Sequence, residues 1–177
     1  ADGTLLSGDL NGNDTYSGTG NTLSIGNAND NAWHIVVSAK NIDNTILDGF
    51  TIKGGNARGT GYQQVFDERT YANMGGGIFL ANNSNPIISN CDFTYNMSST
   101  SGGAVHVSLN SNPVFTNCSF TNNYTGGVGA GATVPLLGFG NVLFHGMKEA
   151  IDQEGFIGLF KGGFTACSVG VSGRSEE

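Results

Sequence analysis

The sequence predicts an all-β fold, a parallel β-helix in which short strands stack coil upon coil. Three observations lead to this prediction: a 27-residue repeat, an excess of glycine and asparagine, and short apolar stretches separated by turn residues. Of the 177 residues, 29 are glycine and 21 are asparagine, and both types are poor helix formers. With 38% hydrophobic residues, a single domain of this length can still bury a core.

The repeat is clearest in the middle of the chain. The segment 86–93 (PIISNCDF) returns 27 residues later as 113–120 (PVFTNCSF). A glycine cluster and an apolar stretch precede each copy, and 34–50 is an earlier, weaker copy. A unit this short cannot bury its own apolar face, so it must stack on its neighbours. Stacking places Ile88 and Phe93 beside Phe115 and Phe120, one strand spacing of ~4.8 Å away.

Asparagine marks the expected bends. It tolerates a left-handed backbone, and its amide can bond the coil above or below. Residues 1–123 contain 20 of the 21 asparagines, so we expect β-helix coils over 1–125 with a loop insertion at 57–73. Residues 126–177 are expected to form irregular final coils or a C-terminal cap, with room for a short helix at 147–153. The segment 164–169 echoes 115–120, which favours final coils.

Charge and composition limit the partners and the location. A net charge of −7 argues against nucleic acid or an anionic membrane as partner. The apolar stretch 128–147 contains Pro135 and several glycines, which disfavour a membrane span. The first ten residues lack a signal peptide, so the chain is expected to be a mature or excised segment. Low charge and abundant polar residues are typical of secreted or surface proteins.

A family resemblance follows from these segments. Residues 6–12 (LSGDLNG), 47–52 (LDGFTI), 54–57 (GGNA) and the two 27-residue units resemble secreted right-handed parallel β-helix repeat proteins. These are the pectin-lyase-like solenoids, akin to polymorphic outer-membrane protein repeats. The resemblance implies a right-handed solenoid of about five to six coils. A second, nine-residue resemblance links 154–162 (EGFIGLFKG) to the signature of mitochondrial carriers.

Two small features have a functional and a structural interpretation. Cys91 and Cys118 occupy the same repeat position. Their side chains should project in parallel, which favours buried thiols over a disulfide. Oxygen-bearing side chains at Asp9, Asn11 and Asn13 match the first positions of a calcium loop, although later positions of that motif do not match. A polar turn before the first coil is the alternative. Calcium is the one cofactor that the sequence allows for.

The interruption at 57–73 is the strongest candidate for ligand binding. Loops inserted into a solenoid usually project from one face and carry binding residues. Aromatic and planar polar side chains in this loop suit sugar rings and hydroxyls. The alternative is a solvated excursion held by Arg–carboxylate pairs. The candidate ligand-binding residues are Arg58, Tyr62, Gln64, Asp67, Arg69 and Tyr71.

Catalysis has weaker support in the sequence. Lys53, Arg58 and His106 are the basic groups that could abstract a sugar proton. No pair of carboxylates suggests a hydrolase, and alternation along its strand predicts that His106 points outward.

We therefore expect a non-catalytic extracellular β-solenoid module with a structural, adhesive or glycan-binding role at the cell surface. One alternative is a polysaccharide lyase or hydrolase acting on acidic glycans. Another is a self-assembling surface or filament subunit, because an open solenoid end can add another copy. The expected partners are glycans or other surface proteins, with end-to-end self-association as a further option.

Overall fold

The computed structural model describes residues 3–19, 22–40, 45–108 and 110–127, together with Gly129 and the short segments 132–133, 143–145 and 157–158. Within these ranges the chain is built almost entirely of short strands joined by bends. No helix in the described ranges has the length and hydrophobicity that a membrane crossing requires.

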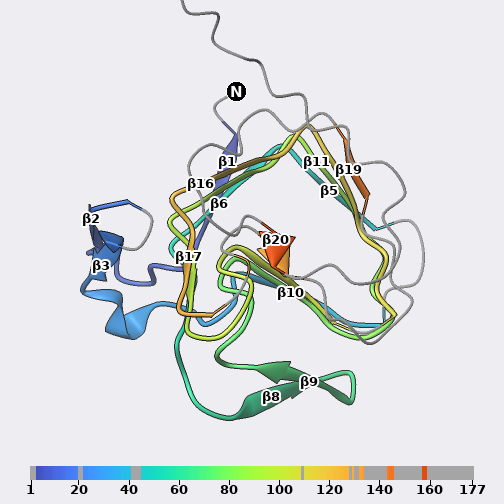
Figure 1. Cartoon of the computed structure of the whole chain (residues 1–177), viewed down its shortest axis with the longest axis horizontal. Helices are drawn as coiled ribbons and strands as arrows, with labels where there is room; N and C mark the ends of the chain where they lie inside the picture. Colours follow the sequence, from blue (N-terminus) through green and yellow to red (C-terminus); the bar gives the residue numbers. More distant parts are fainter. Residues whose placement is uncertain are drawn as a thin grey trace, which may run out of the picture.

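Three parallel sheets and one short ladder run side by side, each taking strands from successive passes of the chain (Figure 1). The first sheet contains β1 (Thr4–Ser7), β6 (Phe50–Lys53), β12 (Asp92–Thr94) and β16 (Ser119–Thr121). The second contains β4 (Val36–Ser38), β10 (Ile78–Leu80), β14 (Val105–Val107), β18 (Ala132–Thr133) and β20 (Ile157–Gly158). The third contains β5 (Ile46–Asp48), β11 (Ile87–Ser89), β15 (Val114–Thr116) and β19 (Leu143–His145). The ladder contains β7 (Asn56–Ala57), β13 (Met97–Ser98) and β17 (Tyr124–Thr125).

The register of these strands follows the repeat. Ile88 pairs with Phe115 and Phe93 pairs with Phe120, both in parallel. The 27-residue step read from the sequence therefore predicted these neighbours correctly. Further along, β15 pairs with β19 so that Phe115 faces Phe144. That step is two residues longer than the repeat.

One apolar interior lies between the three sheets. Phe93 and Phe120 stack with their ring centroids 4.6 Å apart and their planes only 4° from parallel. Phe115, from the third sheet, meets the Phe120 ring edge-on at 5.9 Å. Ile78 and Val105 close the same core cluster from the second sheet. Each pass of the chain thus contributes one layer of side chains to a shared core, as stacking of incomplete units requires.

Asparagines occupy several bends, as the sequence predicted. Asn90 and Asn117, 27 residues apart, have φ of 52° and 53°, and Asn122 has φ of 52°. The equivalent of Asn122 one repeat earlier is Tyr95, which has φ of 53°. Short polar side chains adopt this left-handed region more readily than bulky ones.

A buried amide pair joins two passes at the next position. Asn123 Oδ1 accepts the backbone N–H and the side-chain N–H of Asn96, each at 3.0 Å. The side chain of Asn123 donates to the carbonyl oxygen of Phe93 at 2.8 Å. Both asparagines are almost fully buried, so these contacts satisfy polar groups that have no access to water.

Two antiparallel excursions leave the parallel sheets. The first contains β2 (Thr15–Ser17), β3 (Ser24–Gly26) and a 3-10 turn at Ala28–Asp30. The second is a hairpin of β8 (Tyr62–Val65) and β9 (Glu68–Tyr71). Figure 1 shows both lying outside the outline of the parallel sheets.

Most of 126–177 lies outside the described residues, so the expected cap, the helix at 147–153 and Cys167 are not part of this description. The same holds for the carrier-like segment 154–162, apart from β20.

Candidate functional site

Within the loop at 57–73, the strands β8 and β9 form a β-hairpin that is closed by a two-residue turn. Val65 faces Glu68 across the turn, and Phe66 and Asp67 occupy the two turn positions. Both have positive φ, 49° and 64°. A two-residue turn matches the twist of its strands only when both turn residues have positive φ. Asn-Gly is the usual sequence for such a turn. The turn therefore carries a bulky aromatic residue in an unfavourable backbone region.

One face of this hairpin gathers four of the six predicted binding residues. Tyr62 pairs with Tyr71, and Gln64 pairs with Arg69, so all four side chains project to the same side. The two tyrosine rings meet edge-on at 6.1 Å. The Arg69 guanidinium lies over the Tyr62 ring, with Cζ 4.6 Å from its centroid. This face of the hairpin therefore consists of two tyrosine rings, and the Arg69 guanidinium lies over one of them.

The other two predicted binding residues lie elsewhere. Arg58 Cζ is 5.9 Å from the ring centroid of Tyr124 on β17. Asp67 is at the tip of the hairpin, where Lys40 Nζ lies 3.8 Å from its carboxylate and 3.9 Å from that of Glu68. The expected Arg–carboxylate pairs are wrong for the described residues, because both arginines lie against tyrosine rings and a lysine holds the acidic residues.

The three candidate catalytic residues do not form one site. Lys53 Nζ lies over the Tyr16 ring, 4.1 Å from its centroid, and 5.5 Å from that of Tyr95. Arg58 contacts Tyr124. His106 stacks against Phe79 with a centroid distance of 5.0 Å. Each group thus contacts a different aromatic residue, and no shared proton-transfer geometry arises.

His106 lies outside the core cluster that contains its neighbours Val105 and Val107, but the expectation that such an outward side chain faces solvent is wrong. Its residue surface is only 7% exposed. Ser101, which forms a parallel bridge with Met74, lies beside it, and Ser101 Oγ is 3.1 Å from His106 Nδ1. Burial, and to a smaller extent the neighbouring His34, together lower the pKa of His106 to about 4. Alternation along a strand does not reveal that another segment will lie against its outer face.

The two described cysteines are free and buried. Cys91 Sγ donates to the carbonyl oxygen of Ser89 at 3.1 Å, and Cys118 Sγ donates to that of Ile88 at 3.4 Å. The prediction of buried thiols is confirmed for this pair.

The predicted calcium loop has its leading carboxylate turned inward. Asp9 Oδ1 accepts the backbone N–H groups of Gly12 and Asn13 at 2.8 and 3.2 Å, and Oδ2 accepts that of Asp14 at 3.0 Å. These hydrogen bonds hold the pKa of Asp9 below its ordinary value. Within the described ranges, no three His, Cys, Asp or Glu residues lie close enough to hold a metal ion. Calcium at Asp9, Asn11 and Asn13 stays a prediction.

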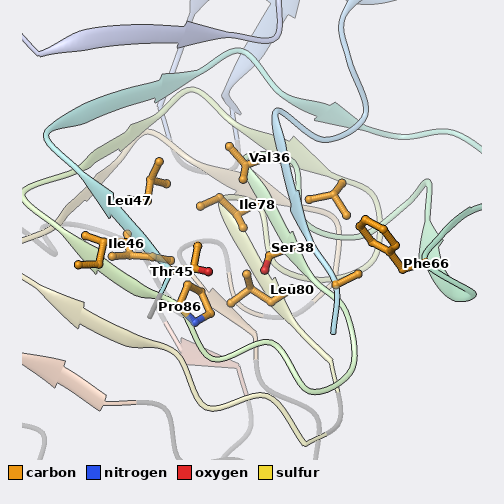
Figure 2. A pocket seen from close by; sticks show the side chains of 12 residues that line it. Val36, Ser38, Thr45, Ile46, Leu47, Phe66, Ile78, Leu80 and Pro86 are labelled. Carbon is orange, nitrogen blue, oxygen red and sulfur yellow. The ribbon is translucent and has the colours of Figure 1, made fainter. Parts of the chain in front are cut away.

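An apolar groove opens where the second and third sheets end. It has a volume of about 270 Å³, and Figure 2 shows side chains of β4 and β5 around it with Phe66 at one side. Ser38 and Thr45 provide the hydroxyl groups of an otherwise apolar lining. Phe66 reaches the groove from the hairpin tip although it is 75% exposed. The groove is lined by Val36, Val37, Ser38, Ala39, Thr45, Ile46, Leu47, Phe66, Ile78, Leu80, Pro86 and Ile88.

One small side chain, Ser38, and the edges of the outermost strands, which are unpaired in the described part of the chain, leave this groove open. Ser38 stands in register with Leu80 and thus with Val107. Leu47 stands in register with Ile88 and thus with Phe115. Among the described strands, none pairs with the outer edges of β4 and β5. Sequence reasoning missed the groove. The signal was Ser38 in the weak copy 34–50, which stands where the later copies have Leu80 and Val107.

Comparison with known proteins identifies a family relationship. A family model described as SpoVAC/SpoVAEB sporulation membrane protein matches residues 71–174. Neither the curated proteins nor the solved structures gave a match to this chain.

The family match overturns several expectations. The resemblance to pectin-lyase-like repeat proteins and the nine-residue resemblance to carriers are wrong as family assignments. The adhesive or glycan-binding module, the polysaccharide lyase or hydrolase and the filament subunit are likewise wrong. An extracellular or cell-surface location is also wrong, because the family is one of membrane proteins of sporulation. Repeats rich in glycine and asparagine indicate where a chain turns. They do not indicate its family or function, because one architecture serves many functions.

Proposed function

Because the chain belongs to the SpoVAC/SpoVAEB sporulation membrane protein family, we propose that it acts at a membrane of the sporulating cell as a protein-binding component. In this proposal the stacked sheets form a rigid support, and the groove beside β4 and β5 receives an extended apolar segment of a partner protein in the same membrane. The observation that carries the proposal is the combination of an apolar groove with two edge strands.

The support itself is proposed to be a right-handed parallel β-helix. Such coils require three sheets that take strands from successive passes of the chain, as seen here with a 27-residue step from β11 to β15 and from β12 to β16. Crossovers between parallel strands are right-handed in about 98% of cases, which supports that hand. An experimentally determined structure with left-handed or unconnected passes would contradict this part of the proposal.

A peptide strand matches the groove better than a small apolar molecule would. Edge strands present unpaired backbone groups that another strand can satisfy. In the described part of the chain, the outer edges of β4 and β5 are in this state on both sides of the groove. An incoming strand with bulky side chains at alternate positions would bond one of these edges and fill the space beside Ser38. A small molecule would fill only the space.

A binding role also fits the separation of the basic residues. Lys53, Arg58 and His106 each contact a different aromatic ring. The proposal therefore assigns no reaction to them and places the functional surface at the groove.

Photo-crosslinking in sporulating cells tests this proposal. A photoreactive amino acid replaces Ile46, which is 63% exposed beside the groove. The matched control replaces Ile87, which occupies the same register position one pass further in. We expect the full chain in the membrane fraction and a discrete crosslink to another membrane protein from position 46 alone. Val37→Pro, which removes a backbone donor from β4, should abolish it.

Other results would contradict the proposal. Recovery of the full chain only in the soluble fraction would exclude action at the membrane. Equal crosslinking from positions 46 and 87 would exclude the groove as the binding surface. A crosslink only to a second copy of the chain would show self-association in place of a different partner.

A further inference from the structure

The first excursion packs against the end of β6 through a cluster of polar side chains. Asp14, Tyr16 and Asn31 come from the excursion, and Gly54 follows β6. Figure 1 shows β2 and β3 of this excursion beside the first sheet, away from β8 and β9. The cluster is therefore separate from the hairpin and from the groove.

The Asp14 carboxylate is satisfied on one oxygen only. Oδ2 accepts the Tyr16 hydroxyl at 2.8 Å and the Asn31 side-chain N–H at 2.7 Å. Oδ1 is buried and has no hydrogen-bond partner. Lys53 lies nearby but over the Tyr16 ring, and the ion pairs of the described residues do not include Asp14. A buried carboxylate oxygen without a donor or cation is costly.

Asn31 presents a second oxygen of the same kind. This residue is only 8% exposed. Its Nδ2 donates to Asp14 Oδ2 and to the carbonyl oxygen of Gly54, both at 2.7 Å. Turning the amide over would set an oxygen against these two acceptors, so the orientation is fixed. Asn31 Oδ1 is consequently buried without a partner, on a group that is hydrogen-bonded directly to Asp14.

A third unpartnered oxygen lies along the same contact. Asn56 Nδ2 donates to the carbonyl oxygen of Ala28 at 2.9 Å, and Asn56 Oδ1 is buried without a partner. The backbone N–H of Asn56 donates to the carbonyl oxygen of Ala32 at 2.8 Å. Asp14 and the segments 28–32 and 54–56 thus contribute three buried acceptor oxygens without a partner, and the Asp14 carboxylate is the charged one.

We propose that this cluster binds a hard divalent cation, with Asp14 Oδ1 and Asn31 Oδ1 as its protein ligands and water completing the coordination. Carboxylate and amide oxygens are the ligands that Ca²⁺ takes in proteins, usually six to eight in number. A single carboxylate predicts weak binding, of the ~10⁻⁴–10⁻³ M class found where affinity is tuned by few charges.

Titration with Ca²⁺ alone tests the site on the full chain after removal of metal ions. We expect a saturable calorimetric signal with one site and a rise in the thermal midpoint with Ca²⁺ concentration. Tb³⁺ is a second probe, because Tyr16 is bonded to the ligand carboxylate and should sensitise its luminescence. Addition of Ca²⁺ should quench that luminescence.

Matched variants separate this site from the one that the sequence predicts. Asp14→Asn and Asn31→Leu should each weaken Ca²⁺ binding at least tenfold, whereas Asp9→Asn should keep it within about threefold. Tyr16→Phe should remove the sensitised luminescence while the calorimetric signal persists. Far-ultraviolet circular dichroism checks that each variant is folded.

Two results would overturn the proposal. Loss of binding in Asp9→Asn with retention in Asp14→Asn would place the cation at the sequence-predicted loop. An absence of binding and stabilisation in the unaltered chain up to ~10 mM Ca²⁺, above the expected range, would mean that buried water alone satisfies the oxygens.

Discussion

His106 shows how burial changes the chemistry of a single residue. Its imidazole is packed against Phe79 on one coil, and His34 packs against the other side of the same ring at 5.2 Å. Burial lowers the pKa of His34 as well. A charged imidazole in this ladder would lose hydration that no described carboxylate replaces, so both rings are expected to be neutral in the folded chain at pH 7.

A pH dependence of stability follows. Between pH 6.5, the ordinary pKa of histidine, and about 4, the folded pKa of His106, the unfolded chain binds more protons than the folded chain. Stability therefore falls as pH falls through this window. The full shift corresponds to about 3 kcal/mol, reached only below the folded pKa. Urea unfolding at pH 7 and pH 4.5 should show a smaller loss for His106→Gln than for the unaltered chain. An equal loss would contradict the assignment.

The buried Asn96–Asn123 pair allows the stability cost of removing one buried amide to be predicted. Asn123→Ala removes the acceptor for two N–H groups of Asn96 and leaves both in the core. Each buried donor without a partner costs about 1–3 kcal/mol, so the loss should be about 3–4 kcal/mol in urea unfolding. Thr121→Ala, on a half-buried position of the same repeat, is the control and should cost less than 1 kcal/mol. Equal losses would show that the amide pair is not special.

At the scale of elements, the hairpin turn is the least favourable local structure. Phe66 and Asp67 both have positive φ, where bulky residues carry a strain of order 1–3 kcal/mol each. The double substitution Phe66→Asn with Asp67→Gly supplies the preferred turn sequence. Amide hydrogen exchange across β8 and β9 should become slower by about tenfold.

The same double substitution also removes one apolar wall of the groove, because Phe66 is part of its lining. An apolar fluorescent dye should therefore bind the variant less strongly than the unaltered chain. As a control, Tyr62→Asn leaves Phe66 in place and should not change dye binding. Faster exchange in the hairpin would contradict the strain assigned to its turn.

At the scale of the whole molecule, the 27-residue step makes the chain modular. Deletion of residues 90–116 joins Ser89 to Asn117, which preserves the order of strands and the bend residue at the junction. We expect a folded, shorter chain with cooperative urea unfolding and a reduced m-value, because less surface is buried.

Deletion of 20 residues from the same segment is the control. It breaks the register and should abolish cooperative unfolding. If both deletions unfold the chain equally, the passes are not interchangeable units.

The sequence could predict what repeats and could not predict what occurs once. Spacing alone located the neighbours Ile88–Phe115 and Phe93–Phe120. Of the four equivalent bend positions 90, 95, 117 and 122, asparagine identified three, and Tyr95 occupies the other with the same positive φ. The contact of Asp14 with Asn31 and Gly54 joins residues without periodicity. The turn at Phe66 lacks the usual residues, and the family could not be read from the repeat, since architecture does not determine function.

Lys40 forms ion pairs with the hairpin tip, which carries the groove residue Phe66. Lys40 holds Asp67, which is 96% exposed on its side chain, and Glu68 at 3.8 and 3.9 Å, and such solvated pairs contribute about 0–1 kcal/mol. Salt screens them, with a Debye length of only ~8 Å at physiological ionic strength. The hairpin tip that places Phe66 at one side of the groove is thus fastened weakly, and rising ionic strength weakens this contact. The position of that wall of the groove is therefore expected to respond to the salt concentration around the protein.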